Sequence, residues 1–234
     1  MEGEFIKNTI ATDQFIIQDV IGDNACFYRA VANYIYFAQS NNTNDIEIIK
    51  TFKNWGDIGK LENIGKENLF QTELAEYLQK IIYNYIKEHP TKTLPFMGDM
   101  TIQNAIPFIH NITYKEYLDY YKLCAFKEYN DDDFVIDRWG SSLEVFIVSE
   151  IIKCPIIVFN TQTWSKRYKK IINGKIIKNK PEKNVRLKPS VIVGKKYIGK
   201  RLPIYLIWRE YHGNGHYMTL YPKNNTDILS TIIQ

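Results

Sequence analysis

The stretch that decides how this chain is interpreted is "GDNACFYRAV", residues 22–31. Cys26 lies three residues after Asp23, where an apolar pattern with helical spacing begins. The apolar residues of this pattern are Phe27, Ala30, Val31, Tyr34, Ile35 and Ala38. Their spacing predicts a helix with one apolar face. Asn24 is a suitable N-cap, so we expect Cys26 in the first helical turn.

A cysteine in the first turn of a helix has a chemical use that a core cysteine lacks. A thiol is an effective nucleophile only as the thiolate, and the dipole and free N–H groups of a helix N-terminus favour negative charge. The same N–H groups can stabilise the oxyanion that forms when a thiolate attacks a carbonyl. The alternative interpretation of Cys26 is a small hydrophobic core residue.

A cysteine nucleophile also needs a base, which is normally a histidine. The chain has four histidines, at positions 89, 110, 212 and 216. His216 opens the apolar stretch "HYMTLY" and follows Gly213 and Gly215, which permit a close approach of the backbone. Spacing alone does not choose among the four histidines. His212 and His216 lack the helical setting and the neighbouring Glu of a zinc site, so we expect no metal.

Length and composition indicate a globular protein. The chain has 234 residues, of which 45% are apolar and 24% charged. Neither a transmembrane run of about 18 apolar residues nor a secretion signal is present. The three cysteines, Cys26, Cys124 and Cys154, are odd in number and far apart, so we expect no disulfides and a cytoplasmic location. Cys124 and Cys154 lie in apolar contexts typical of a core.

The basic residues are concentrated in one stretch. Residues 166–201 contain 14 basic residues and one acid, Glu182, for a net charge of +13. The rest of the chain has 16 basic and 25 acidic residues, for a net charge of −9. We interpret this stretch first as a solvated hairpin. The alternative is a surface that binds an anionic partner, such as nucleic acid, acidic lipid or an acidic protein face.

Helices are predicted mainly in the first part of the chain and strands mainly in the last. A helix is expected around 70–87, helical pieces over 100–128 with a break near Pro107, and a helix in "SLEVFIVSEII", 142–152. "FIIQDVI", 15–21, is read as extended, and "CPIIVFN", 154–160, as a buried strand. The "NG" of "YKKIINGKIIKNK", 168–180, predicts a hairpin, and 202–222 predict two strands around a Gly-rich loop. This order indicates an α/β or α+β fold with a sheet packed against helices.

Three segments together resemble one family. "GDNACFYRAV" resembles the "DGNC-LF-RA" signature of the ovarian-tumour (OTU) domain cysteine proteases. "RWGSSLEVFIVSEIIKCPIIVF", 138–159, is similar to the "WGG-E-EL-ALA-----PI-V" segment of that family. "LPIYLIWREYHGNGHYMTLY", 202–221, is similar to its strand, loop and "HY" strand. The three matches occur in the family's order.

The resemblance implies a papain-like thiol protease that removes ubiquitin from proteins without a cofactor. On matching positions, Cys26 is the nucleophile, His216 is the general base, and Asp23 belongs to the loop whose backbone helps to form the oxyanion hole. Asn24 and Ala25 lie in that same loop. Trp139 and Gly140 match scaffold residues near the site, and Trp139 is a candidate substrate contact. Asp132 and Asp133 in "NDDD", 130–133, are candidates to meet the arginines before the terminal Gly-Gly of ubiquitin, or form a solvated loop.

The chain departs from the family pattern at two places near the site. Asn24-Ala25 stands where the family has Gly-Asn after the aspartate. Met218 stands where the family has the Asn or Asp that orients the histidine, and a thioether is only a weak acceptor. We therefore expect another residue to orient His216. Asp19 is the preferred choice, because its extended segment can run beside the histidine strand. Asp13, Asn214 and the absence of any third residue are the alternatives.

The sequence thus predicts one domain over 1–234, with a papain-like fold of OTU type, a central sheet flanked by helices, an inserted segment at about 41–100 and a basic β-hairpin at about 166–201. The expected function is deubiquitination by a monomer that docks ubiquitin on the inserted segment. Such a lone catalytic domain suits a viral or bacterial effector in host cytosol. The alternatives are an inactive ubiquitin-binding module, an anion-binding domain, and an enzyme that transfers the acyl group to an acceptor other than water.

Overall fold

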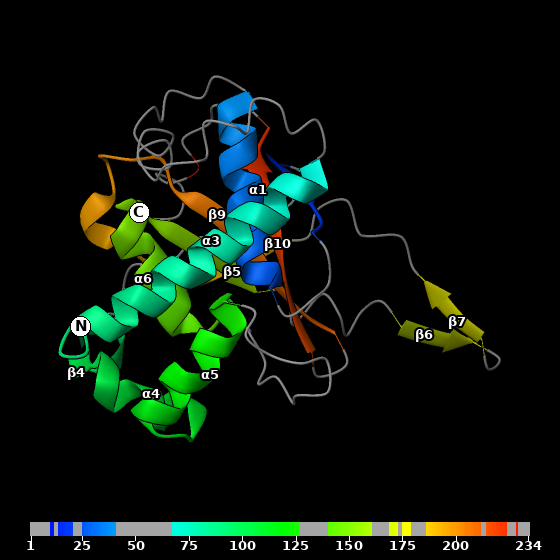
Figure 1. Cartoon of the computed structure of the whole chain (residues 1–234). Helices are drawn as coiled ribbons and strands as arrows, with labels where there is room; N and C mark the ends of the chain where they lie inside the picture. Colours follow the sequence, from blue (N-terminus) through cyan, green and yellow to red (C-terminus); the bar gives the residue numbers. More distant parts are fainter. Residues whose placement is uncertain are drawn as a thin grey trace.

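The computed structural model describes residues 10–11, 14–20, 25–40, 67–126, 140–160, 169–172, 175–178, 186–211, 214–223 and 228. The fold is mixed α/β, as the sequence predicts, with one large sheet and helices packed against it (Figure 1). A search of the helices in these ranges finds none with the length and hydropathy needed to cross a membrane. None of the three cysteines is in a disulfide, and all three are buried.

The central sheet has six strands in the order β1-β8-β5-β9-β10-β2. These strands are β1 (Ile10–Ala11), β8 (Arg186–Val193), β5 (Ile156–Asn160), β9 (Ile204–Tyr211), β10 (Asn214–Pro222) and β2 (Phe15–Gln18). Neighbouring strands are antiparallel except β5 and β9, which are parallel. The strand predicted at 154–160, the strand pair predicted at 202–222 and the extended segment after Gln14 are therefore confirmed.

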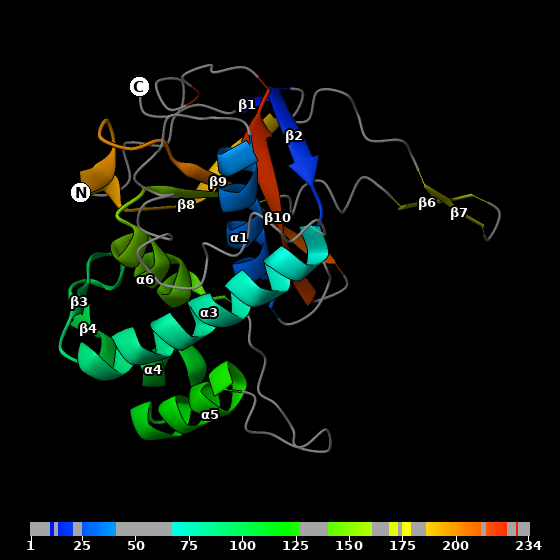
Figure 2. The ribbon, with the colours of Figure 1, turned by 45° about the horizontal axis from the view of Figure 1, so that its top comes forward.

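Five described helices and several short elements complete the fold. The helices are α1 (Cys26–Ser40), α3 (Glu67–Glu88), α4 (Ile102–His110), α5 (Tyr114–Phe126) and α6 (Ser142–Ile152). The short elements are β3 (Thr93–Leu94), η3 (Pro95–Met97), β4 (Met100–Thr101), β6 (Lys169–Ile172), β7 (Lys175–Lys178) and η4 (Lys195–Tyr197). Helix α1 packs on β9 and β10, α6 packs on β5 and β8, and α3 crosses both helices on the outside (Figure 2).

Helix α1 is buried on nearly all sides, which corrects the expectation of a single apolar face. Every described side chain from position 26 to position 35 is buried, because the sheet covers one side of the helix and α3 the other. The polar members of this run are bonded to neighbouring elements. Arg29 donates to Thr72 Oγ1 of α3 at 2.8 Å, and Asn33 Nδ2 donates to Thr219 Oγ1 of β10 at 3.3 Å. The helix that begins at Cys26 is therefore fixed from both sides.

The helix break predicted near Pro107 is wrong. Pro107 lies inside α4, which continues to His110 and ends where Asn111 adopts the left-handed conformation. A proline inside a helix deprives the carbonyl four residues earlier of its donor. Here that carbonyl belongs to Gln103, an exposed residue to which water has access, and only one further turn follows. The helix expected around 70–87 is confirmed as α3, and the one at 142–152 as α6.

The basic hairpin is shorter than the predicted 166–201. Strands β6 and β7 are antiparallel and pair with Ile172 opposite Lys175, which confirms a hairpin in the predicted 168–180 stretch, while Asn173 and Gly174 lie outside the described residues. Strand β8, in the same basic stretch, instead belongs to the central sheet between β1 and β5. In both views β6 and β7 stand apart from the sheet and the helices (Figures 1 and 2).

The segment expected as an insertion, 41–100, contributes to the core. Residues 41–66 lie outside the described part of the chain. Helix α3 packs against α1, α5 and α6. Its inner side is apolar and fully buried at Leu78, Ile82 and Ile86. The helix expected as part of an accessory segment thus covers the helix that carries Cys26.

Candidate active site

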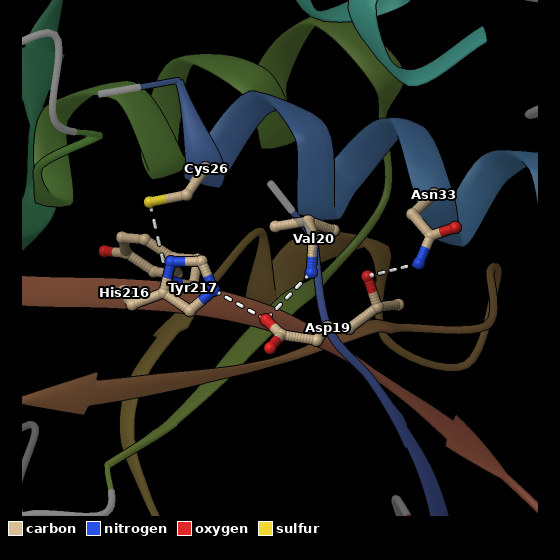
Figure 3. Close-up of polar contacts among 7 residues, drawn as sticks. Asp19, Val20, Cys26, Asn33, His216 and Tyr217 are labelled. Carbon is tan, nitrogen blue, oxygen red and sulfur yellow. Dashed lines mark hydrogen bonds and ion pairs between the residues drawn. The ribbon is translucent and has the colours of Figure 1, made fainter. Parts of the chain in front are cut away.

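Asp19 and His216 meet where β2 ends beside β10. The carboxylate oxygen Oδ1 of Asp19 lies 2.7 Å from Nε2 of His216 (Figure 3). The same oxygen accepts the backbone N–H of Val20 at 2.9 Å, which orients the carboxylate towards the imidazole. The structure therefore brings together two of the residues singled out in the sequence, from segments almost at opposite ends of the chain.

The strand register explains why these two side chains meet. Ile17 of β2 is paired with Leu220 of β10. Side chains alternate between the faces of a sheet with a period of two, so Asp19 shares a face with Ile17, and His216 shares a face with Leu220. Both side chains therefore lie on one side of the sheet. Met218 lies on the same face of the sheet, and its side chain is buried in the core.

Cys26 lies against the peptide that joins His216 to Tyr217. The backbone N–H of Tyr217 is directed at the sulfur of Cys26, with an N–S distance of 3.5 Å. Cys26 is the first residue of α1, as the sequence predicts, and its side chain is 4% exposed. The thiol therefore combines the positive end of a helix with a backbone donor from the histidine strand.

The imidazole of His216 lies between the sulfur and the carboxylate. Nε2 faces Asp19, and the other ring nitrogen, Nδ1, is on the side of Cys26 (Figure 3). A carboxylate accepts a hydrogen from Nε2 and so selects the tautomer in which Nδ1 carries a lone pair. The side chain of His216 is 23% exposed and that of Asp19 75% exposed, so the site opens to solvent on the Asp19 side.

Tyr217 connects the two sides of the site through its ring and its hydroxyl. The ring packs edge-on against Phe27, with centroids 5.3 Å apart, and the hydroxyl donates to the carbonyl of Gly140 at 2.9 Å. Burial, together with the nearby Cys26 and Glu144, raises the pKa of Tyr217 well above its usual value. The hydroxyl therefore remains a donor over the working pH range of the protein.

Gly140, whose carbonyl accepts the Tyr217 hydroxyl, directly precedes the capping box of α6. The side chain of Ser141 accepts the N–H of Leu143, and the carboxylate of Glu144 accepts the N–H of Ser141 at 2.6 Å. Glu144 is buried and also accepts the hydroxyl of Tyr117. Because these bonds fix the N-terminus of α6, the carbonyl of the preceding Gly140 is a well-defined anchor point.

Several residues expected at the site lie outside the described part of the chain. These are Asp13, Asp23, Asn24, Asp132, Asp133, Trp139 and His212. Ala25 is described: it is buried, and its carbonyl accepts the N–H of Arg29 at 3.0 Å. Asn214 begins β10 opposite Tyr211. Gly140, expected as scaffold, lies against Phe27, where an added Cβ would be 2.3 Å from the nearest ring carbon.

Sequence reasoning missed the part that Tyr217 plays. The "HY" pair marks the position, but the pattern of a half-buried strand does not tell a core tyrosine from one that contacts the cysteine. It also missed the bonds of Thr219 and Tyr221. The hydroxyl of Thr219 donates to the Ala30 carbonyl at 2.8 Å, and that of Tyr221 to the Asn33 carbonyl at 2.6 Å. Every second residue of β10 thus contacts α1.

Comparison with known proteins gives a match to one family. The sequence model of the OTU-like cysteine protease family matches residues 61–217, about two thirds of the chain. The matched range includes Gly140 and His216 and begins after Cys26. No curated protein matches the chain. A solved structure, the viral OTU domain protease from Taggert virus, is similar at 14% identity and a TM-score of 0.44, over 93% of this chain and 88% of that chain.

Proposed function

Because the chain belongs to the OTU-like cysteine protease family, we propose that it is a deubiquitinating peptidase with Cys26 as the nucleophile and His216 as the general base. The observation that carries the proposal is the convergence of three distant segments. Asp19 lies 2.7 Å from His216, and the residue after His216 directs its N–H at Cys26. A nucleophile, a base and an orienting acid brought together from distant segments are what acyl transfer by a thiol requires.

In the first step, Nδ1 of His216 takes the proton of the Cys26 thiol. The resulting thiolate attacks the carbonyl carbon of the last glycine of ubiquitin and forms the S–C bond of a tetrahedral intermediate. Asp19 accepts a hydrogen bond from Nε2–H and so stabilises the imidazolium. The free N–H groups at the start of α1 are suited to hold the oxyanion, since charge develops there in a water-poor site.

In the second step, the imidazolium gives its proton to the nitrogen of the substrate lysine. The C–N bond breaks, and the lysine leaves as a neutral amine while ubiquitin remains on Cys26 as a thioester. His216 then takes a proton from water, the hydroxide attacks the thioester carbonyl, and the C–S bond breaks. Ubiquitin leaves with a free carboxylate, and the thiol is restored.

The substrate side of the proposal rests on the family resemblance. We assign Asp23, Asn24 and Ala25 to the oxyanion loop, Trp139 to the substrate channel, and Asp132 and Asp133 to the arginines near the C-terminus of ubiquitin. The body of ubiquitin docks on the 41–100 segment and the helices beside it. The 1–234 chain acts as one catalytic domain and needs no cofactor.

Hydrolysis of a ubiquitin substrate with a fluorogenic C-terminal amide tests this function. The wild-type protein releases the fluorophore, and Cys26→Ala does not, although it still binds ubiquitin because little volume is removed. Parallel assays with ubiquitin-like modifiers identify the preferred modifier. Mass analysis of the product separates hydrolysis, which leaves a free carboxylate, from transfer to another acceptor. Full turnover by Cys26→Ala contradicts the proposal, and ubiquitin binding without turnover by the wild type favours an inactive binding module.

A second function is proposed for the basic stretch, namely association with an anionic partner. The register of the β6–β7 hairpin places Lys169 directly opposite Lys178. An isolated two-stranded hairpin is marginally stable in water. Residues 166–201 contain 14 basic residues and one acid, and such a concentration of positive charge attracts a polyanion. This concentration of charge favours a docking role that is separate from peptide-bond hydrolysis.

A further inference from the structure

The helix that carries Cys26 and the strand that carries His216 are joined directly through the residue that follows the histidine. Tyr217 makes three contacts from one position: its N–H is directed at the Cys26 sulfur, its ring packs on Phe27, and its hydroxyl reaches the Gly140 carbonyl. The first two contacts involve consecutive residues of α1. The third involves the anchored start of α6.

We propose that Tyr217 is a positioning residue that sets the placement of the Cys26 sulfur relative to the His216 imidazole. This inference rests on the proposed function, because it concerns the same nucleophile and base. Tyr217 does not touch the reacting atoms through its side chain. Its ring and hydroxyl instead fix its own backbone, and with it the N–H that faces the sulfur and the adjoining His216.

The packing around Phe27 leaves little freedom for this arrangement to shift. Phe27 is fully buried and contacts both Tyr28 and Tyr217 edge-on, with centroids 5.2 and 5.3 Å apart. On another side it lies against Gly140, where an added Cβ would be only 2.3–2.5 Å from Phe27 atoms. The same glycine carries the carbonyl that accepts the Tyr217 hydroxyl. Gly140 thus contacts both partners of the Phe27–Tyr217 pair.

The N–H of Tyr217 also has an electrostatic role in this arrangement. A backbone donor directed at sulfur favours the thiolate over the thiol, and its loss favours the thiol. The Tyr217 hydroxyl, which holds this backbone, donates a hydrogen bond to the Gly140 carbonyl, and the capping box of α6 keeps that carbonyl in place. Removal of the Tyr217 hydroxyl alone is therefore expected to affect the Cys26 sulfur, because it allows the Tyr217 backbone to shift.

The strand offers a matched control. Tyr221 lies on the same face of β10, four residues further along, and its hydroxyl donates to the Asn33 carbonyl of α1 at 2.6 Å. Tyr217→Phe and Tyr221→Phe each remove one buried hydroxyl and one hydrogen bond to a backbone carbonyl. Only the first change lies beside Cys26. A purely structural role predicts the same behaviour for both variants, and a positioning role does not.

The experiment compares wild type, Tyr217→Phe and Tyr221→Phe in two assays. The first is steady-state cleavage of the fluorogenic ubiquitin substrate. The second is alkylation of Cys26 by iodoacetamide as a function of pH, followed by mass spectrometry, which needs no ubiquitin. We expect Tyr217→Phe to lower kcat by about three- to tenfold, in line with the loss of one hydrogen bond, with KM changed less than about twofold. The midpoint of Cys26 alkylation moves to higher pH. Tyr221→Phe matches the wild type in both assays.

Wild-type kcat and a wild-type alkylation midpoint in a folded Tyr217→Phe protein overturn the inference. Equal kinetic losses in Tyr217→Phe and Tyr221→Phe also overturn it, because they indicate a general loss of stability. Thermal unfolding of each variant establishes that it is folded. If iodoacetamide alkylates Cys26 of the wild type but the wild type does not cleave ubiquitin, the proposed function is contradicted. The alkylation assay then still tests the role of Tyr217.

Discussion

The carboxylate of Asp19 lies 2.7 Å from Nε2 of His216, across 197 positions of sequence. The same carboxylate oxygen accepts the N–H of Val20. The group that we propose orients His216 therefore lies just after β2, before the cysteine helix, and the residue two positions after the histidine, Met218, is buried in the core. The arrangement has consequences for which substitutions of the acid the enzyme tolerates.

Asp19→Asn should retain more activity than Asp19→Ala. The N–H of Val20 selects an acceptor, so the carbonyl oxygen of asparagine is expected to take the position of Oδ1 and to hold His216 in the same tautomer. Asparagine in place of the aspartate of a serine-protease triad costs about 10⁴ in rate because it selects the wrong histidine tautomer, an outcome that the N–H of Val20 opposes here by holding the amide oxygen towards its own side. Asp19 is largely exposed, so we expect kcat to fall by about 10- to 100-fold in Asp19→Ala, because solvent screens its charge.

Steady-state cleavage of the fluorogenic ubiquitin substrate measures this order of activities. Asp13→Ala and Asn214→Ala are the controls, because they replace the other candidates for the orienting residue and should leave kcat unchanged. Wild-type turnover in a folded Asp19→Ala protein would show that the carboxylate does not orient His216. Loss of activity in Asp13→Ala alone would assign the role to Asp13.

Substitution of the two other cysteines should affect stability and not chemistry. Cys154 is completely buried, with its sulfur 2.9 Å from the carbonyl of Leu202, and Cys124 is buried in α5. Burial of the more polar serine costs up to about 1–3 kcal/mol where the hydroxyl has no acceptor, and at position 154 the carbonyl of Leu202 offsets part of this cost. Urea unfolding should therefore move to lower denaturant in Cys124→Ser and Cys154→Ser, while kcat stays within about twofold of wild type at a temperature where both are folded. A selective loss of turnover in folded Cys154→Ser would show that Cys26 is the wrong choice of nucleophile.

Stability should fall on mild acidification because of His110. Its ring packs against that of Tyr117 at a tilt of 33°, with centroids 4.7 Å apart, and among the described residues its buried Nε2 has no hydrogen-bond partner. Burial lowers the pKa of His110, and the nearby Glu144 opposes this only in part. The unfolded chain, with a histidine pKa of about 6.5, then binds more protons than the folded chain as the pH falls. The stability that His110 contributes is complete above pH 6.5 and is lost below it.

Urea unfolding at about pH 7.5 and 5.5 checks this expectation. The wild type should lose stability between the two conditions through His110, and His110→Gln should lose less. All other titratable groups are common to the two proteins, so the difference between them isolates His110. An identical loss in the two proteins would show that His110 keeps its ordinary titration.

The basic hairpin should be separable from catalysis. Reversal of Lys169, Lys170, Lys178 and Lys180 to Glu should weaken the salt-dependent association with anionic lipid vesicles, RNA or poly-glutamate, because it replaces attraction between opposite charges, which salt screens, by repulsion. Turnover of the small fluorogenic substrate should stay within a few-fold of wild type. If that turnover collapses instead, the hairpin belongs to the ubiquitin site.

Much of the fold could be predicted from local pattern. The helix that starts at Cys26, the buried strand before Asn160 and the pairing of β6 with β7 each have a signal confined to neighbouring residues. The burial of residues 26–35 of α1 on both sides had no such signal, because it depends on long-range packing: α3 covers the side that carries Arg29, and β10 bonds Asn33 on the other side. Pro107 led to the wrong prediction of a helix break, because the carbonyl that it leaves without a donor belongs to an exposed residue of α4.

The site could be predicted only in part, for a similar reason. Asp19 was singled out because Met218 cannot orient an imidazole, but the choice against Asp13 and Asn214 depends on the register of β2 with β10. Tyr217 could not be recognised, because its contacts with Cys26, Phe27 and Gly140 join three segments that no local pattern relates. Long-range geometry, and not residue type, distinguishes these positions.

The most direct test of the central claim is covalent labelling by ubiquitin with a C-terminal electrophile. The labelled protein is digested, and the modified residue is located by mass spectrometry. We predict one adduct per molecule, on Cys26, which is absent in Cys26→Ala and much slower to form in His216→Ala. An adduct on Cys124 or Cys154, or no adduct with a folded wild-type protein, would contradict the assignment of Cys26 as the nucleophile of a deubiquitinase.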